Sequence, residues 1–127
     1  MDGRDRYLAE RVTTATPGQL IKMLLDRLLV ELDMAKSHLD DGQRPAASPH
    51  ILRAQDIVTE LRSSLNLDAG DIAGQLDELY SYAFAELVEA QLGGDPTHIS
   101  HAATVLAPVQ DAWTHVLASQ SQPAAAV

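Results

Sequence analysis

The sequence predicts an all-α protein, an antiparallel bundle of four helices. Ala, Leu, Asp and Glu dominate the composition and aromatic residues make up only 4% of it, which favours helices over strands. Apolar residues recur at steps of three and four along four segments, which are separated by helix-start and helix-stop signals. No segment alternates with the period of two that indicates a strand. The 127 residues suffice for one hydrophobic core, so we expect a single domain.

The first helix is expected to run from Pro17 to about Leu39. Thr16, Pro17 and Gln19 form the pattern of a capping box, with Thr16 as the N-cap and proline at the first helical position. The pattern ends at Asp40-Asp41-Gly42. The stripe expected to face the core comprises Ile21, Leu24, Leu28, Leu32, Ala35 and Leu39.

The second helix is expected to start at Ser48-Pro49, where a capping residue again precedes proline. Its pattern fades between Asn66 and Gly70. Its apolar stripe comprises Ile51, Ala54, Val58, Leu61 and Leu65.

The third helix is expected to begin near Asp71 and to stop at Gly93-Gly94, because a glycine pair suits a left-handed turn at a helix C-terminus. Four further apolar residues, Tyr80, Tyr82, Phe84 and Val88, lie off its main stripe. That stripe comprises Ile72, Leu76, Leu79, Ala83, Leu87 and Ala90.

The fourth helix is expected to start at Asp95-Pro96 and to fade near Ser119. Pro108 lies inside it, either as a tolerated kink or as a hinge about which the second half shifts when a partner binds. We therefore expect a bundle over residues 16–118, a short segment before it at 1–15, and a flexible tail at 119–127. The stripe of this helix comprises Ile99, Ala102, Leu106, Val109, Trp113 and Val116.

The charge balance excludes several classes of partner. Nine Lys and Arg stand against 18 Asp and Glu, a formal net charge of -9, which argues against a nucleic-acid binder and against attraction to anionic lipids. No apolar run approaches the length of a bilayer span, and the first six residues lack the apolar stretch of a signal peptide. The chain has no cysteine, which excludes disulfides and thiolate sites. We expect a cytosolic protein.

The sequence shows no convergent polar groups of the kind that an enzyme needs. Gly70 and Gly74 follow no strand and precede no lysine, so they do not form a phosphate loop. Asp95 and His98 match one carboxylate-x-x-His element of a di-iron bundle, but such a site needs two copies at mid-helix and two further carboxylates. We therefore interpret the histidines, including the neighbouring His98 and His101, as surface residues. No catalytic residue, cofactor or metal site is expected.

A histidine phosphotransfer bundle is a weaker alternative. His38 has Lys36 close by, but it lies at a helix end next to Asp40 and Asp41. His50 lies at an expected helix start, where the positive end of the helix dipole disfavours a charged ring. Neither histidine lies at mid-helix on a clear approach surface.

The helices carry more apolar residues than one stripe each requires. In the first helix they cover most of the circumference, and Ile57 next to Val58 adds to the second. A second stripe must be buried by something else, either by self-association into a dimer or by a partner segment in a hydrophobic groove.

Four segments of the sequence carry motifs in a characteristic order and spacing. Tyr7 and residues 12–26 hold a tyrosine, a stretch similar to Val-x-Thr-Ala-Ser-Pro and a leucine-rich turn. Residues 53–66 look like an Arg-Ala-Gln-x-Ile-Ile-x-Glu-Leu motif ending in Ser-Leu-Asp, and residues 76–82 look like a Leu-x-x-Leu-Tyr-x-Tyr element. Trp113 follows near the end of the fourth helix. In this order the four segments resemble the signatures of the FliS family of flagellar secretion chaperones, which also closes with a tryptophan.

Three positions depart from the family pattern. Thr16 stands where serine is usual and Leu25 where tyrosine is frequent, and these changes keep capping chemistry and size. Gln91 stands where asparagine commonly follows alanine. This third change is expected to alter a hydrogen bond near the end of the third helix.

The resemblance implies a cytosolic chaperone, without an active site, that holds the disordered C-terminal segment of flagellin before export. Flagellin is thus the expected partner, and the flagellar export gate and flagellar regulators are further candidates. The segment around Tyr7 would cover part of an apolar groove as a lid until the client binds. The alternative is an oligomeric or adaptor bundle without a client.

The residues expected to contact the client combine apolar side chains with polar tips. For Leu61 and Leu65 a core position is the favoured alternative, and Trp113 is expected in the core. The candidate contact residues are Tyr7, Val12, Gln55, Asp56, Ile57, Leu61, Leu65, Tyr80, Tyr82, Leu87 and Val88.

Overall fold

The first helix, α2 (Pro17–Asp40), starts where its capping signal predicts in the computed structural model, which describes residues 15–121. The hydroxyl oxygen of Thr16 accepts a hydrogen bond from the backbone N–H of Gln19 at 3.2 Å. In return, the side-chain oxygen of Gln19 accepts one from the backbone N–H of Thr16 at 2.9 Å. The predicted capping box is therefore confirmed.

The second helix, α3 (Arg44–Ser63), starts four residues before Ser48, so the predicted start at Ser48-Pro49 is wrong. The backbone N–H of Ala47 already donates to the carbonyl of Gln43 at 3.1 Å. Pro49 lies inside the helix and lacks the N–H of one helical hydrogen bond. The first turn forms nevertheless, because Ala47 is buried and the Ser48 hydroxyl accepts a 2.6 Å hydrogen bond from Gln91 on the third long helix.

A short 3₁₀ helix, η1 (Leu67–Ala69), leads into α4 (Asp71–Gly93). Gly94 ends α4 in the left-handed conformation, at φ +73°, and its backbone N–H donates to the carbonyl of Ala90 at 2.8 Å. The predicted beginning and end of this helix are confirmed.

The last helix, α5 (Pro96–Ser121), begins after Asp95, whose carboxylate accepts a 2.9 Å hydrogen bond from the backbone N–H of Thr97. The helix continues through Pro108 and extends two residues beyond the expected end at Ser119. The rest of the predicted tail, residues 122–127, lies outside the described residues, as do residues 1–14 of the segment predicted over 1–15.

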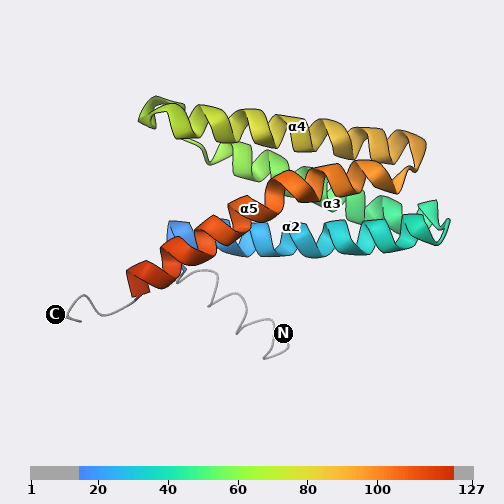
Figure 1. Ribbon diagram of the computed structural model, residues 1–127, viewed down its shortest axis with the longest axis horizontal. Helices are drawn as coiled ribbons and strands as arrows, with labels where there is room; N and C mark the ends of the chain where they lie inside the picture. Colours follow the sequence, from blue (N-terminus) through green and yellow to red (C-terminus); the bar gives the residue numbers. More distant parts are fainter. Residues whose placement is uncertain (1–14, 122–127) are drawn as a thin grey trace, which may run out of the picture.

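The four long helices pack as an antiparallel bundle, so the predicted all-α fold is confirmed (Figure 1). Each helix packs against the next along the chain, and α5 also packs against α2 and closes the ring. Figure 1 shows α5 crossing the bundle obliquely, from beside α4 at its start to beside the start of α2 at its end. Between residues 15 and 121 no helix has both the length and the apolar character needed to cross a bilayer.

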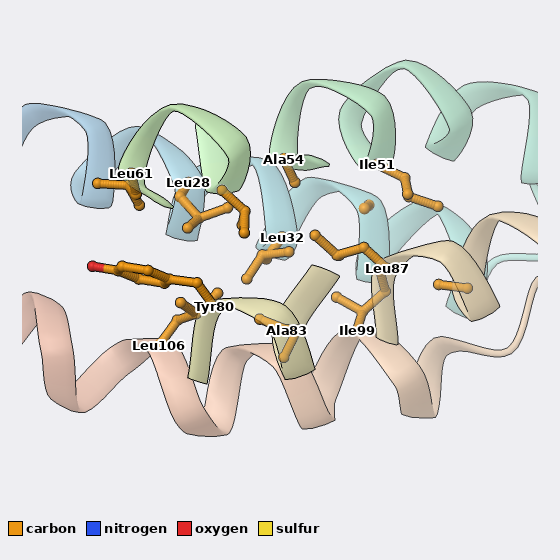
Figure 2. Close-up of a cluster of buried hydrophobic side chains, with 14 of the residues drawn as sticks. Leu28, Leu32, Ile51, Ala54, Leu61, Tyr80, Ala83, Leu87, Ile99 and Leu106 are labelled. Atoms are coloured by element: carbon orange, nitrogen blue, oxygen red, sulfur yellow. The ribbon is translucent and has the colours of Figure 1, made fainter. Parts of the chain in front are cut away.

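Side chains from all four helices build one hydrophobic core. Figure 2 shows Leu61, Tyr80 and Leu106, from three different helices, pointing into the same space. The predicted stripes of α2, α3 and α5 supply most of this core. On α4 the predicted stripe is buried at Ala83, Leu87 and Ala90, but it is shifted in the first half of the helix, where Tyr80 is buried and Ile72 is 73% exposed. This shift leaves apolar surface at the beginning of α4.

Candidate functional site: two apolar grooves at one end of the bundle

The first groove lies between the beginning of α2 and the end of α3, and we name it the α2–α3 groove. It has a volume of about 580 Å³. Its floor is apolar, while the carboxylates of Asp56 and Glu60 lie on its α3 side. Its lining residues are Leu20, Met23, Leu24, Asp56, Ile57 and Glu60.

This groove exists because both helices carry apolar residues beside their core stripes. Leu25 and Leu28 of α2 are fully buried, whereas the neighbouring Leu24, which was expected on the core stripe, is only partly covered. On α3 the same holds for Ile57, which flanks the buried Val58. The second apolar stripe predicted from the sequence is therefore present as partly exposed surface.

The second groove lies between the beginning of α4 and the second half of α5, and we name it the α4–α5 groove. It has a volume of about 450 Å³, and no charged residue lines it. Ile72 on one wall is largely exposed. Its lining residues are Ile72, Leu76, Pro108, Val109, Ala112, Trp113 and Val116.

This second groove opens because the end of α5 leaves α4 and packs against α2. Gly18 of α2 permits the close approach: a Cβ atom added there would lie 3.2 Å from the Trp113 ring and 3.3 Å from Leu117. The side-chain amide of Gln110 donates a 2.8 Å hydrogen bond to the carboxylate of Asp26 on α2. Ile72 at the beginning of α4 stays 73% exposed.

A lysine on α2 also binds the Asp26 carboxylate. The ammonium of Lys22 lies 2.6 Å from its other oxygen. Partial burial raises the pKa of Asp26, but the hydrogen bonds from Lys22 and Gln110 outweigh this effect and hold the pKa below its usual value. The carboxylate is therefore charged at neutral pH and fixes the end of α5 on α2.

Both grooves lie at the same end of the bundle. In an antiparallel bundle the beginnings of α2 and α4 meet the ends of α3 and α5, as Figure 1 shows on its left side. The ion pair of Arg62 at the end of α3 with Asp77 near the beginning of α4, at 3.1 Å, and the Gln110 to Asp26 hydrogen bond connect these elements. A long segment could therefore contact both grooves.

Among the predicted contact residues, Asp56 and Ile57 line the α2–α3 groove. Their neighbour Gln55 is partly buried, and Leu65 is partly buried against the core. Tyr7 and Val12 lie outside the described residues.

Three other predicted contact residues belong to the core. Leu61, Tyr80 and Leu87 are exposed by only 1%, 2% and 0%. For Leu61 this burial confirms the core position that was favoured from the sequence. For Tyr80 and Leu87 the expected place on a groove is corrected, because their side chains fill the centre of the bundle. Tyr82 is exposed and Val88 partly buried on α4, and neither of the two grooves includes them.

Much of the site could not be located from the sequence. The apolar excess at residues 20–30 was the signal for Leu20, Met23 and Leu24, but it did not show which side of α2 faced outward. Trp113 was expected in the core, and it lies half-buried on the wall of the α4–α5 groove.

Comparisons of the sequence with a family model and with known proteins point to one family. The family model described as flagellar protein FliS matches residues 1–120. The chain is 33% identical over 104 residues to the flagellar secretion chaperone FliSB of Pseudomonas aeruginosa, covering 81% of this chain and 82% of that protein. It is 32% identical to the flagellar secretion chaperone FliS of Salmonella typhimurium, covering 83% and 79%. It is 27% identical to that of Vibrio cholerae, covering 84% and 79%. A four-helix bundle whose sequence matches this family over nearly its whole length belongs to the FliS family of flagellar proteins.

Proposed function

We propose that this protein is a cytosolic export chaperone that binds the disordered C-terminal segment of flagellin. Bound in this way, flagellin would be kept from premature polymerisation and would stay competent for flagellar secretion. The observation that carries the proposal is the pair of apolar grooves at one end of the bundle. The names of the curated relatives, flagellar secretion chaperones, support it.

The grooves suit a segment that orders only when it binds. Ordering such a segment costs roughly 2–5 kcal/mol, so the contact must bury a large apolar area. Amphipathic helices bind in this way, with apolar side chains at helical spacing placed in a hydrophobic groove. Two grooves offer the client two such sites.

The edge of the α2–α3 groove adds polar contacts. Asp56 and Glu60 are exposed acceptors beside the apolar floor. In this proposal they accept hydrogen bonds from client backbone N–H groups or pair with basic client side chains. These contacts would orient the segment, while the apolar floor provides most of the affinity.

The proposed role is binding without catalysis. Among the described residues that line the grooves, the ionisable side chains are the two carboxylates Asp56 and Glu60. Acyl or phosphoryl transfer would require a nucleophile, a base and oxyanion donors that converge on one point. The further parts of the proposal, contact with the export gate and a lid formed by the segment around Tyr7, stay predictions.

Calorimetry with a synthetic peptide of the flagellin C-terminus tests the proposal. We expect saturable binding with a negative heat-capacity change, the mark of apolar burial. Ile57→Asp places a charge on the groove floor and is expected to weaken binding at least about tenfold, or about 1.4 kcal/mol.

The matched control is Leu52→Asp on the same helix, at an exposed position outside the grooves. This variant is expected to bind like the wild type. Absent peptide binding combined with a concentration-dependent dimer would overturn the proposal in favour of a self-associating bundle. If Ile57→Asp and Leu52→Asp lost equal peptide affinity, the α2–α3 groove would not be part of the binding site.

A further inference from the structure

We propose that Glu86, His98 and His101 form a binding site for a divalent transition-metal ion, with Zn²⁺ as the leading candidate. The three residues lie near the end of α4 and the beginning of α5, at the end of the bundle opposite the grooves. The proposal is thus independent of flagellin binding.

The geometry already brings the three side chains to one point. One carboxylate oxygen of Glu86, Oε2, lies 2.7 Å from Nδ1 of His98 and 3.1 Å from Nδ1 of His101. Their candidate ligand atoms all lie within 4.8 Å of one another. Over residues 15–121, this is the one group of three or more His, Asp or Glu side chains gathered closely enough to hold a metal ion.

Two imidazoles and one carboxylate are a ligand set that Zn²⁺ accepts, with metal–ligand distances of about 2.0–2.2 Å. Tetrahedral ligands at that distance lie about 3.3 Å apart, so the observed contacts need only a small outward movement. The side chains of Glu86, His98 and His101 are 17%, 31% and 49% exposed. An ion bound there can reach solvent and complete its coordination with water.

The backbone positions of the ligands are fixed by the core. His98 directly precedes the buried Ile99, His101 directly precedes the buried Ala102, and Glu86 directly precedes the buried Leu87. The loop between α4 and α5 consists only of residues 94–95, which limits their relative movement. The ion would replace the protons shared between the rings and the carboxylate, and would tie the two helices together.

The sequence did not indicate this site because the third ligand is distant along the chain. Spacing along the chain pairs His98 with Asp95, but the Asp95 carboxylate instead accepts a hydrogen bond from the backbone N–H of Thr97 at the beginning of α5. Glu86 lies twelve residues before His98 and reaches it only through the packing of α4 on α5. The ligand set that looked incomplete therefore has three members in the folded protein.

Titration of the full chain with Zn²⁺, followed by calorimetry, tests the site. We expect one ion per chain and a higher melting temperature with zinc, because an ion that binds only the folded state stabilises it. The visible absorption of bound Co²⁺ gives a second readout that reports its ligand geometry. Glu86→Gln and His101→Ala are each expected to weaken binding at least tenfold and to abolish the thermal shift.

The matched control is His38→Ala, which alters a different histidine pair. The rings of His38 and His50 stack with centroids 5.5 Å apart, and neither residue belongs to the group around Glu86. This variant is expected to bind zinc like the wild type. The proposal is overturned by absence of saturable binding, by wild-type affinity in Glu86→Gln or His101→Ala, or by loss of binding in His38→Ala.

Discussion

Glu31 of α2 and His50 of α3 are joined inside the bundle, with Oε2 of the carboxylate 2.5 Å from Nδ1 of the ring. Among the described residues, Glu31 is the only buried charged side chain, at 0% exposure. Two arginines approach it from the surface: Arg27 lies 2.6 Å from Oε1 and Arg53 lies 3.9 Å from Oε2. The buried charge is thus compensated from both helices.

Glu31 is expected to make the folded state less stable as the pH falls. Burial raises the pKa of this carboxyl, but the hydrogen bond from His50 and the charge of Arg27 outweigh burial and hold the pKa below its usual 4.5. A carboxyl with a lowered pKa stabilises the folded state above its unfolded pKa and loses this contribution as the pH falls through the folded value.

Urea unfolding at about pH 7 and about pH 4 measures this effect. Glu31→Gln is expected to lower the free energy of unfolding at neutral pH by about 1–3 kcal/mol. It should also lose less stability on acidification than the wild type does. Equal losses in the two proteins would show that Glu31 does not contribute to the acid response.

Tyr80 is expected to behave as a core residue. Tyr80→Ala should lower the free energy of unfolding by about 3–5 kcal/mol, because it leaves a cavity between helices. Tyr82→Ala, on the exposed side of the same helix, is the control and should change stability by no more than about 0.5 kcal/mol. Burial also raises the pKa of the Tyr80 phenol. Similar losses in both variants, measured by urea unfolding, would contradict the packing described above.

A side chain at Gly94 is expected to destabilise the protein. At φ +73° an L-residue is strained, and an added Cβ would lie 2.6 Å from the side chain of Arg44. Arg44 would be displaced from the carbonyl of Leu92, to which it donates a 3.0 Å hydrogen bond. Gly94→Ala is therefore expected to cost about 1–2 kcal/mol.

Gly93→Ala is the matched control for this position. An added Cβ at Gly93 meets no atom within 4 Å, and the residue lies in the helix. Thermal unfolding should show this variant unchanged or stabilised by up to about 1 kcal/mol. If both substitutions prove equally harmless, the left-handed end of α4 is not rigid.

The contact of α5 with α2 is expected to depend on Gly18. Gly18→Leu should push Trp113 away from α2 and lower the free energy of unfolding by about 1–3 kcal/mol. Trp113 is the one tryptophan of the chain, so its fluorescence emission reports the displacement as a shift to longer wavelength. Gly74→Leu, whose added Cβ meets no atom within 4 Å, should leave the emission unchanged. Unchanged emission in Gly18→Leu would contradict the close approach.

Local signals predicted most helix boundaries, and tertiary contacts decided the rest. Thr16 and Gly94 make their capping hydrogen bonds within a few residues, so the sequence was enough to find them. Ser48-Pro49 carried a similar signal, yet the helix begins earlier because Ser48 binds Gln91, 43 residues away. Gln91, one of the positions that depart from the family pattern, thus makes a contact between α4 and α3.

The candidate site was harder to predict than the fold. Periodicity finds an apolar face, but Leu79 and Tyr80 fit helical stripes equally well, and only the packed bundle shows that Tyr80 is the buried one. The sequence did predict excess apolar surface, and Ile57 within it. It could not predict the α4–α5 groove, because that groove results from the oblique course of α5 over α2.

The described chain enters the bundle at Thr16 and leaves it at Ser121, both at the end that holds the grooves. A dye or affinity tag attached close to either residue would lie near the grooves proposed to bind the client segment. The turn at residues 41–43 lies at the remote end and is exposed. Because the chain contains no cysteine, Asp41→Cys would provide a unique thiol there. Labelling at that thiol would permit observation of the protein without obstructing either groove.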